Sequence, residues 1–124
     1  MKNKIEMGLR ILIGLMLTFS GLNKLMGFMP MPEMAEAGTA FMSALAETKY
    51  IMPAIALVEI VGGILLAINK SVPFALILLA PIVFNIFCFH LILDPAGLGA
   101  GITFVVTLGW FAWNRKEEFS SLFK

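Results

Sequence analysis

The chain has 124 residues, of which 60% are hydrophobic and 14% are charged, whereas soluble domains are about 45–50% apolar and about 25% charged. A core of this size could not bury so much apolar surface in water, so the composition excludes an ordinary soluble domain and favours a single membrane-embedded domain. The net charge of +1 excludes a nucleic-acid-binding surface, and the single cysteine, Cys88, excludes an internal disulfide or a CxxC redox pair.

Four apolar stretches are long enough to cross a bilayer as helices, because a span needs about 20 mostly apolar residues. They cover approximately residues 5–25, 50–68, 72–93 and 98–113. All four should be helices, since lipid offers no partner to the backbone groups of an open sheet edge. The sequence therefore predicts an all-α fold, a four-transmembrane-helix bundle that forms one domain over residues 1–124.

One face of the first predicted span combines two cations with two glycines. The residues that share this face are Arg10, Gly14, Leu17, Gly21 and Lys24, which follow the helical spacing i, i+4, i+7, i+11 and i+14. Glycines allow the backbone of a neighbouring helix to approach closely. We therefore expect this face to pack against another span.

The segment between the first two spans is too polar to cross the bilayer and reads MPMPEMAEAGTAFMSALAETK. Its apolar side chains recur at roughly helical spacing, opposite Glu36 and Glu47. These apolar residues are Met34, Phe41, Met42 and Leu45. The pattern predicts an amphipathic helix over about residues 33–47 that lies in the membrane interface.

The second span contains one carboxylate, Glu59, in the sequence LVEIVGGILL. At a rise of about 1.5 Å per residue, Glu59 lies roughly 13 Å from Tyr50, near the middle of the bilayer. A bare carboxylate there costs about 2.5–3.5 kcal/mol on insertion scales. We expect Glu59 either to take a proton or to form an ion pair, with Lys24 as the first candidate partner and Arg10 as the alternative.

A stripe of small residues accompanies Glu59 on the second span. Ala56 and Gly63 share its face, and Gly62 lies beside them. We infer that this stripe packs against the glycine-bearing face of the first span. Two interpretations of Glu59 then remain open: a buried ion pair that only fixes the register of the two helices, or a group that binds a ligand or relays a proton.

The third span begins at Ser71, a candidate N-cap, carries Pro81 in its interior and ends at Asp94. It contains two further polar residues. Asn85 lies at a depth similar to that of Glu59. His90 lies close to the end of the helix, where it could satisfy backbone carbonyls, contact a ligand, transfer a proton or, least expectedly, bind a metal or haem.

The distribution of Lys and Arg predicts the orientation of the chain in the membrane. With the N-terminus in the cytoplasm, seven of the nine cations lie on the inner side, and only Lys24 and Lys49 lie outside. The seven are Lys2, Lys4, Arg10, Lys70, Arg115, Lys116 and Lys124. Both termini should therefore be cytoplasmic, the interfacial helix extracytoplasmic, and the candidate ligand residues in the outer half of the bundle. Those residues are Lys24, Glu59, Asn85 and His90.

A cluster of methionines on the outer side is a candidate Cu(I) site. It consists of Met26, Met29, Met31 and Met34. Thioethers are soft ligands that select Cu(I), but methionine is also common as an apolar filler in membrane segments. The sequence contains no zinc-ligand spacing, no phosphate-binding glycine loop and no nucleophile–base motif, so we predict no other metal site.

Three segments in order resemble the DoxX family of small bacterial and archaeal membrane proteins. They are GLRILIGLMLTFSGLNKL, YIMPAIALVEIVGGILLAIN and LLAPIVFNIFCFH. The resemblance implies a four-helix bundle in the cytoplasmic membrane with both termini inside. It also implies a link to redox biology, because members of the wider family are associated with quinol oxidase, thiosulfate:quinone oxidoreductase or thiol-stress complexes.

Three functional hypotheses follow from the residues and the resemblance. The first is an accessory, non-catalytic subunit of a membrane redox complex, with a partner protein and a small hydrophobic ligand such as a quinone. The second is a small proton-coupled transporter that uses Glu59 as its titrating group. The third is a scaffold or assembly factor, in which the Glu59–Lys24 pair is purely structural. A homo-oligomer is compatible with each of them.

Overall fold

The computed structural model describes residues 2–27 and 33–121, and this part of the chain consists of helices joined by short turns, with no β-strand. Four helical stretches are long and apolar enough to cross a membrane: Lys4–Met26, Ile51–Ile68, Val72–Leu93 and Pro95–Trp113. They confirm the four predicted spans to within a few residues. The fold is therefore an all-α bundle of a multi-pass membrane protein.

The helices follow one another with short connections. They are α1 (Lys2–Met26), α2 (Glu36–Glu47), α3 (Ile51–Ile68), α4 (Val72–Cys88), the π-helical turn η1 (Phe89–Leu93), the 3₁₀ turn η2 (Pro95–Gly97), α5 (Leu98–Trp113) and α6 (Lys116–Ser120). The sequence predicts a single helix up to residue 93, whereas the last turn of that helix is π-helical. Such turns are rare and occur often at functional sites.

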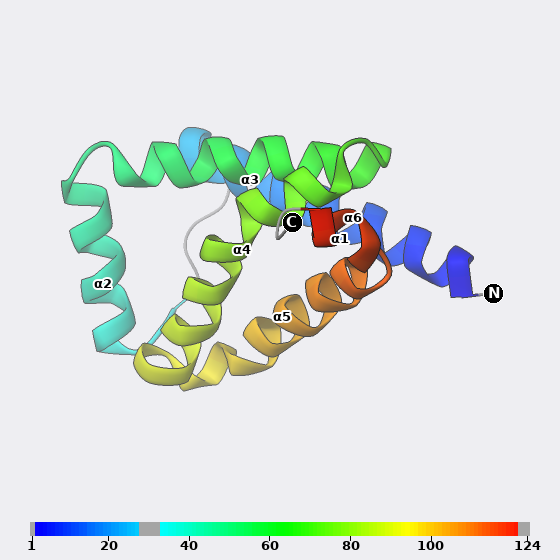
Figure 1. Ribbon diagram of the computed structural model, residues 1–124. Helices are drawn as coiled ribbons and strands as arrows, with labels where there is room; N and C mark the ends of the chain where they lie inside the picture. Colours follow the sequence, from blue (N-terminus) through cyan, green and yellow to red (C-terminus); the bar gives the residue numbers. More distant parts are fainter. Residues whose placement is uncertain (1, 28–32, 122–124) are drawn as a thin grey trace.

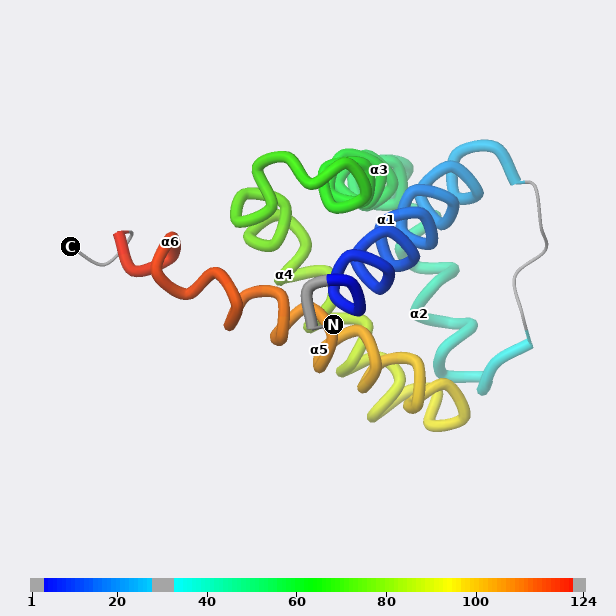
Figure 2. The backbone as a smooth tube through the Cα atoms, turned by 90° about the vertical axis from the view of Figure 1, so that its right-hand side faces the viewer, coloured from blue at the N-terminus to red at the C-terminus, as the bar shows by residue number. Residues whose placement is uncertain are grey.

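The bundle consists of two helix pairs. α1 packs along α3, α3 packs on α4, and α4 packs on α5 (Figures 1 and 2). Figure 1 shows α4 running away from α3, so that the two pairs diverge towards one end of the molecule. α2 spans this opening from the start of α3 to η1. We call this the α2 end, and we call the opposite end, where α1 begins and α6 lies, the terminal end.

Glycines bring α1 and α3 into backbone contact. A Cβ atom placed on Gly14 would lie 2.5 Å from the carbonyl oxygen of Gly63, and one placed on Gly63 would lie 2.6 Å from the carbonyl oxygen of Gly14. Gly21 meets Ala56 in the same way, at 2.6 Å from its carbonyl oxygen. Gly62 instead faces Leu79 of α4. The two neighbouring glycines of α3 therefore serve two different helix contacts, not one as the sequence suggests.

The apolar core occupies the half of the bundle nearer the terminal end. Its buried members come from α1, the C-terminal part of α3, α4 and the C-terminal part of α5. They are Ile13, Leu17, Leu66, Val72, Ala75, Leu76, Leu79, Val83, Leu108 and Phe111. Because the helix pairs diverge beyond this core, the half nearer α2 is less tightly filled.

The turn between α3 and α4 differs from the expectation in one detail. Ser71 occupies the N-cap position of α4, but its backbone is left-handed, with φ of 48°, and its hydroxyl caps no backbone N–H. The prediction of a side-chain cap was wrong, because the left-handed residues Asn69 and Ser71 already turn the chain, and the carbonyl of Ser71 accepts the N–H of Ala75 at 3.0 Å.

Candidate functional site

A pocket of about 570 Å³ lies between the helix pairs at the α2 end. α1, α3, α4 and η1 supply most of its wall, Phe104 comes from α5, and α2 covers it. All four residues singled out in the sequence as ligand candidates line this pocket: Lys24, Glu59, Asn85 and His90. They come from α1, α3, α4 and η1, so the packing of the helices brings them together.

Glu59 and Lys24 form an ion pair at the inner wall of the pocket. Lys24 Nζ lies 2.8 Å from Glu59 Oε1. The Glu59 residue is only 2% exposed, whereas the Lys24 side chain is 20% exposed. The carboxylate is therefore largely enclosed by the protein, and Lys24 is the more exposed member of the pair.

Ser20 completes this arrangement. Lys24 Nζ donates a hydrogen bond to Ser20 Oγ at 2.8 Å, and Ser20 Oγ lies 3.5 Å from both oxygens of Glu59. Two of the three ammonium protons of Lys24 thus have partners, and one is left for a further acceptor. Our reading of the sequence missed Ser20. Its signal is the spacing of four residues from Lys24, which puts both side chains on one face of α1.

Arg10, the alternative partner of Glu59, lies elsewhere. It is 5% exposed, and its Nη1 donates a hydrogen bond to the carbonyl oxygen of Leu66 near the C-terminal end of α3. A cation at this position is favoured because the last carbonyls of a helix carry partial negative charge and lack helical partners. Its Nε has no hydrogen-bond partner among the described residues. Arg10 therefore braces α1 against α3 on the core side of the glycine contact.

His90 and Asp94 join the pocket to the helix that covers it. His90 Nδ1 lies 3.2 Å from the backbone carbonyl oxygen of Asp94 and 3.5 Å from Asp94 Oδ2. Asp94 Oδ1 accepts the backbone N–H of Ala35, the residue that precedes α2, at 3.2 Å. Asp94 is only 7% exposed. Its carboxylate therefore connects the N-terminus of α2 to the π-helical turn at the end of the third span.

Aromatic and close backbone contacts support the same junction. The rings of Phe41 in α2 and Phe89 in η1 have centroids 5.5 Å apart. A Cβ atom on Gly38 would meet the Phe89 ring at 3.1 Å and Asp94 at 3.4 Å. Asp94 was not among the predicted site residues. Sequence spacing could not find it, because its partner Ala35 is 59 positions away.

Comparison with known families decides what kind of chain carries this site. A profile of the DoxX family matches residues 6–91, which include α1, α2, α3, α4 and the start of η1. The chain belongs to the DoxX family. The match confirms the resemblance and extends over most of the pocket wall, but α5 lies beyond it. No curated protein and no solved structure matches the chain.

The rest of the pocket wall in this DoxX protein is apolar and rich in flexible methionine side chains. Four methionines and three aromatic residues contribute to it: Met16, Met34, Met42, Met52, Phe41, Phe89 and Phe104. Methionine side chains are flexible and polarisable and make favourable contacts with aromatic rings. The pocket thus combines an adaptable apolar wall with polar groups that point to its interior from three different helices.

Asn85 differs from the other polar residues of the pocket. Its amide has no hydrogen-bond partner within residues 2–27 and 33–121, and the residue is exposed. An amide group in a span needs a partner for its donors and its acceptor. Asn85 is therefore the polar side chain of the pocket wall that the protein itself leaves open.

The methionine cluster suggested as a Cu(I) site is only partly described. Met29 and Met31 lie outside the described residues, whereas Met34 lines the pocket and Met26 lies exposed at the end of α1. In the described part of the chain, no three histidine, cysteine, aspartate or glutamate side chains come together at a metal site. Cys88, the lone thiol, is half-buried and does not line the pocket.

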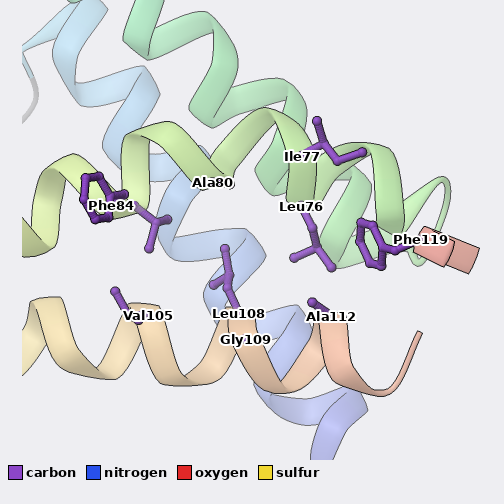
Figure 3. A pocket seen from close by; sticks show the side chains of 10 residues that line it. Leu76, Ile77, Ala80, Phe84, Val105, Leu108, Gly109, Ala112 and Phe119 are labelled. Atoms are coloured by element: carbon purple, nitrogen blue, oxygen red, sulfur yellow. The ribbon is translucent and has the colours of Figure 1, made fainter. Parts of the chain in front are cut away.

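A second hollow of about 310 Å³ lies between α4, α5 and α6 (Figure 3). Every residue that lines it is apolar or a glycine, including Leu76, Phe84, Leu108 and Phe119. Specific recognition of a small molecule needs a few placed polar groups. We therefore take the pocket at the α2 end, and not this hollow, as the candidate site of this DoxX protein.

We expect Asp94→Ala to release α2 from the pocket. The substitution removes the acceptor of the Ala35 N–H, and leaving a half-buried donor unpaired costs about 1–3 kcal/mol. His90 Nδ1 loses only its 3.5 Å contact with Asp94 Oδ2 and keeps the backbone carbonyl of residue 94. Amide protons of α2 should exchange faster in the variant, while those of α3 keep their protection. Asp94→Asn, which retains a side-chain oxygen, is the matched control. Unchanged exchange in α2 of Asp94→Ala would show that Asp94 does not hold this helix.

Proposed function

We propose that this DoxX protein is an accessory subunit of a membrane redox complex and that it binds a small hydrophobic molecule of the quinone class in the pocket at the α2 end. In this proposal it lies in the cytoplasmic membrane of a bacterium or archaeon, with both termini in the cytoplasm. α2 then lies in the outer interface, and the pocket lies in the outer half of the bilayer.

The observation that carries the proposal is the composition of the pocket. Its volume, about 570 Å³, falls within the range of roughly 300–1,000 Å³ that is typical of small-molecule sites. Its walls are mostly apolar, and its few polar groups come from facing helices: Lys24 from α1, Asn85 from α4 and His90 from η1. A ring that carries oxygen atoms on opposite sides suits such a wall, because each oxygen can meet a polar group while the ring contacts methionine and phenylalanine.

Charge supports the orientation. Of the eight Lys and Arg residues within residues 2–27 and 33–121, all but Lys24 and Lys49 belong to the side that carries the terminal end. Under the positive-inside rule this is the cytoplasmic side. Trp113, with Lys116 4.3 Å above its ring, also belongs to this end, as expected for an aromatic residue at the membrane interface. Cysteine-accessibility labelling of a residue in α2 and of one in α6, in intact cells, tests this orientation.

The single cysteine of the chain supports an accessory role. Its one thiol has no second thiol with which to form a disulfide, so the redox centre in this proposal belongs to a partner protein. The outer surfaces of α4, η1 and α5 carry exposed apolar side chains, including Phe84, Ile92 and Val106, and are available to a partner or to a second copy of the chain. Purification in mild detergent, followed by mass spectrometry, distinguishes a partner protein from a second copy of the chain.

The test is a calorimetric titration of the protein in lipid nanodiscs with a decyl-substituted benzoquinone. We expect saturable binding to the wild type and an affinity about tenfold lower for Glu59→Gln, because the carboxylate no longer holds Lys24 at the pocket wall. Glu6→Gln is the matched control, since Glu6 forms an ion pair of the same length, 2.8 Å, with Arg115 near the terminal end. Its affinity should equal that of the wild type.

Asn85→Leu provides a second variant that leaves the Lys24–Glu59 pair intact. It removes the unpartnered amide, so its affinity should fall by about three- to tenfold. Absence of binding in the wild type and in both variants would refute the proposal. Proton-dependent solute flux in proteoliposomes that Glu59→Gln abolishes would favour a transporter instead, and loss of stability without any ligand binding would favour a scaffold.

A further inference from the structure

The surroundings of His90 determine which of its ring nitrogens carries the proton. Two atoms approach Nδ1: the backbone carbonyl oxygen of Asp94 at 3.2 Å and Asp94 Oδ2 at 3.5 Å. A carbonyl oxygen and an ionised carboxylate oxygen can only accept hydrogen bonds. Nδ1 of the neutral imidazole therefore carries the proton and donates it to Asp94, so that Nε2 is left with a free lone pair.

Nε2 of His90 has no such hydrogen-bond partner in the described part of the chain. Gly97 lies against the side of the ring that bears Nδ1 and Cε1, and Gly101 lies beside Cδ2, where an added Cβ atom would be 3.7 Å away. His90 nevertheless lines the pocket, and its side chain is 20% exposed. The open edge of the ring is therefore an acceptor.

We propose that His90 is the residue that selects the redox form of the ligand: its Nε2 accepts a hydrogen bond from a hydroxyl group, so the pocket prefers a dihydroxy ring, a hydroquinone, to the corresponding dione. This inference rests on the proposed function, because it assigns a hydrogen-bond role within the same pocket. It adds the chemical class of the group that the ligand must present at the η1 side.

We assign the preference to His90 because the other acceptor that lines the pocket, the Glu59 carboxylate, is already paired with Lys24 Nζ at 2.8 Å. A quinone carbonyl opposite Nε2 places two acceptors against each other, and neither supplies the other with a hydrogen bond. The polar groups on the other helices do not discriminate in this way. The free N–H of Lys24 donates equally to a hydroxyl or a carbonyl oxygen, and the amide of Asn85 has both a donor and an acceptor.

The experiment compares the decyl-substituted benzoquinone with its hydroquinone in anaerobic titrations at pH 8. We expect the wild type to bind the hydroquinone about tenfold more tightly than the quinone. His90→Asn keeps a donor close to the position of Nδ1 but has no atom in place of Nε2. This variant should keep its affinity for the quinone and lose the preference.

A spectroscopic measurement tests the tautomer independently of affinity. His90 is the only histidine of the chain, so protein labelled with ¹⁵N-histidine and prepared without a histidine tag gives one imidazole. We expect resonances of the Nδ1–H tautomer, and a shift of the Nε2 resonance on addition of the hydroquinone. Asp94→Asn should retain the tautomer, since the backbone carbonyl of residue 94 remains.

The outcomes separate this inference from the function on which it rests. Equal affinity of the wild type for the two ring forms, or an Nε2–H tautomer, would overturn the role of His90 while leaving a quinone-class pocket in place. Binding of neither form would refute the proposed function itself. A hydroquinone preference that persists in His90→Asn would assign the selection to another group.

Discussion

Replacing Lys24 with methionine is expected to lower the free energy of unfolding by about 3–5 kcal/mol, because removal of one partner of a buried ion pair leaves the other charge uncompensated. Glu59 is 2% exposed and lies halfway along α3, enclosed by the protein. Methionine retains the length and apolar stem of lysine, so the loss of charge and not of packing dominates. Equilibrium unfolding of the protein in mixed lipid–SDS micelles measures the change.

Two controls isolate the ion pair. Arg115→Met breaks the pair with Glu6, which has the same 2.8 Å separation. The Glu6 side chain is 14% exposed, against 3% for that of Glu59, so we expect a loss of only about 1 kcal/mol. The double variant Lys24→Met, Glu59→Leu removes both charges and should recover most of the stability, because an apolar pair replaces a buried ionic one. If Lys24→Met costs no more than Arg115→Met, the pair does not stabilise the bundle.

Gly63→Ala is expected to destabilise the contact between α1 and α3 by about 1–3 kcal/mol. The new Cβ atom would lie 2.6 Å from the Gly14 carbonyl oxygen and 2.8 Å from the backbone nitrogen of Thr18. Backbone atoms cannot move aside as a flexible side chain can, so the two helices must separate. The same micelle unfolding experiment measures the loss.

Gly8→Ala is the matched control for this prediction. Gly8 belongs to α1, and an added Cβ atom meets nothing within 4 Å, so the better helix propensity of alanine should stabilise the helix by up to about 1 kcal/mol. Gly109→Ala in α5 offers the same control on the other helix pair. If Gly63→Ala proves as stable to unfolding as these control variants, the backbones of α1 and α3 are not closely packed at Gly63.

The sequence by itself was enough to predict the four spans, the helix between the first two and the glycine face of α1. These features depend on local properties: the hydropathy of about 20 consecutive residues, and the helical spacing that places Gly14, Gly21 and Lys24 on one face. Glu59 could be recognised for the same reason, since a lone carboxylate in an apolar stretch must have a partner. The sequence left two candidate partners for Glu59, Lys24 and Arg10, which lie at different depths in the first span.

Only the tertiary structure decided between those cations, because the choice depends on which side chain reaches across the α1–α3 contact. Lys24 lies against Glu59, while Arg10 is engaged by the carbonyl of Leu66 on the core side. The two roles of Gly62 and Gly63 were equally hidden, since spacing specifies a helix face but not the neighbour that covers it. The pocket itself arises from the divergence of the two helix pairs, and the Asp94–Ala35 hydrogen bond that closes α2 over it joins residues 59 positions apart. Such long-range contacts are set by the packing of whole helices, which no local pattern in the sequence records.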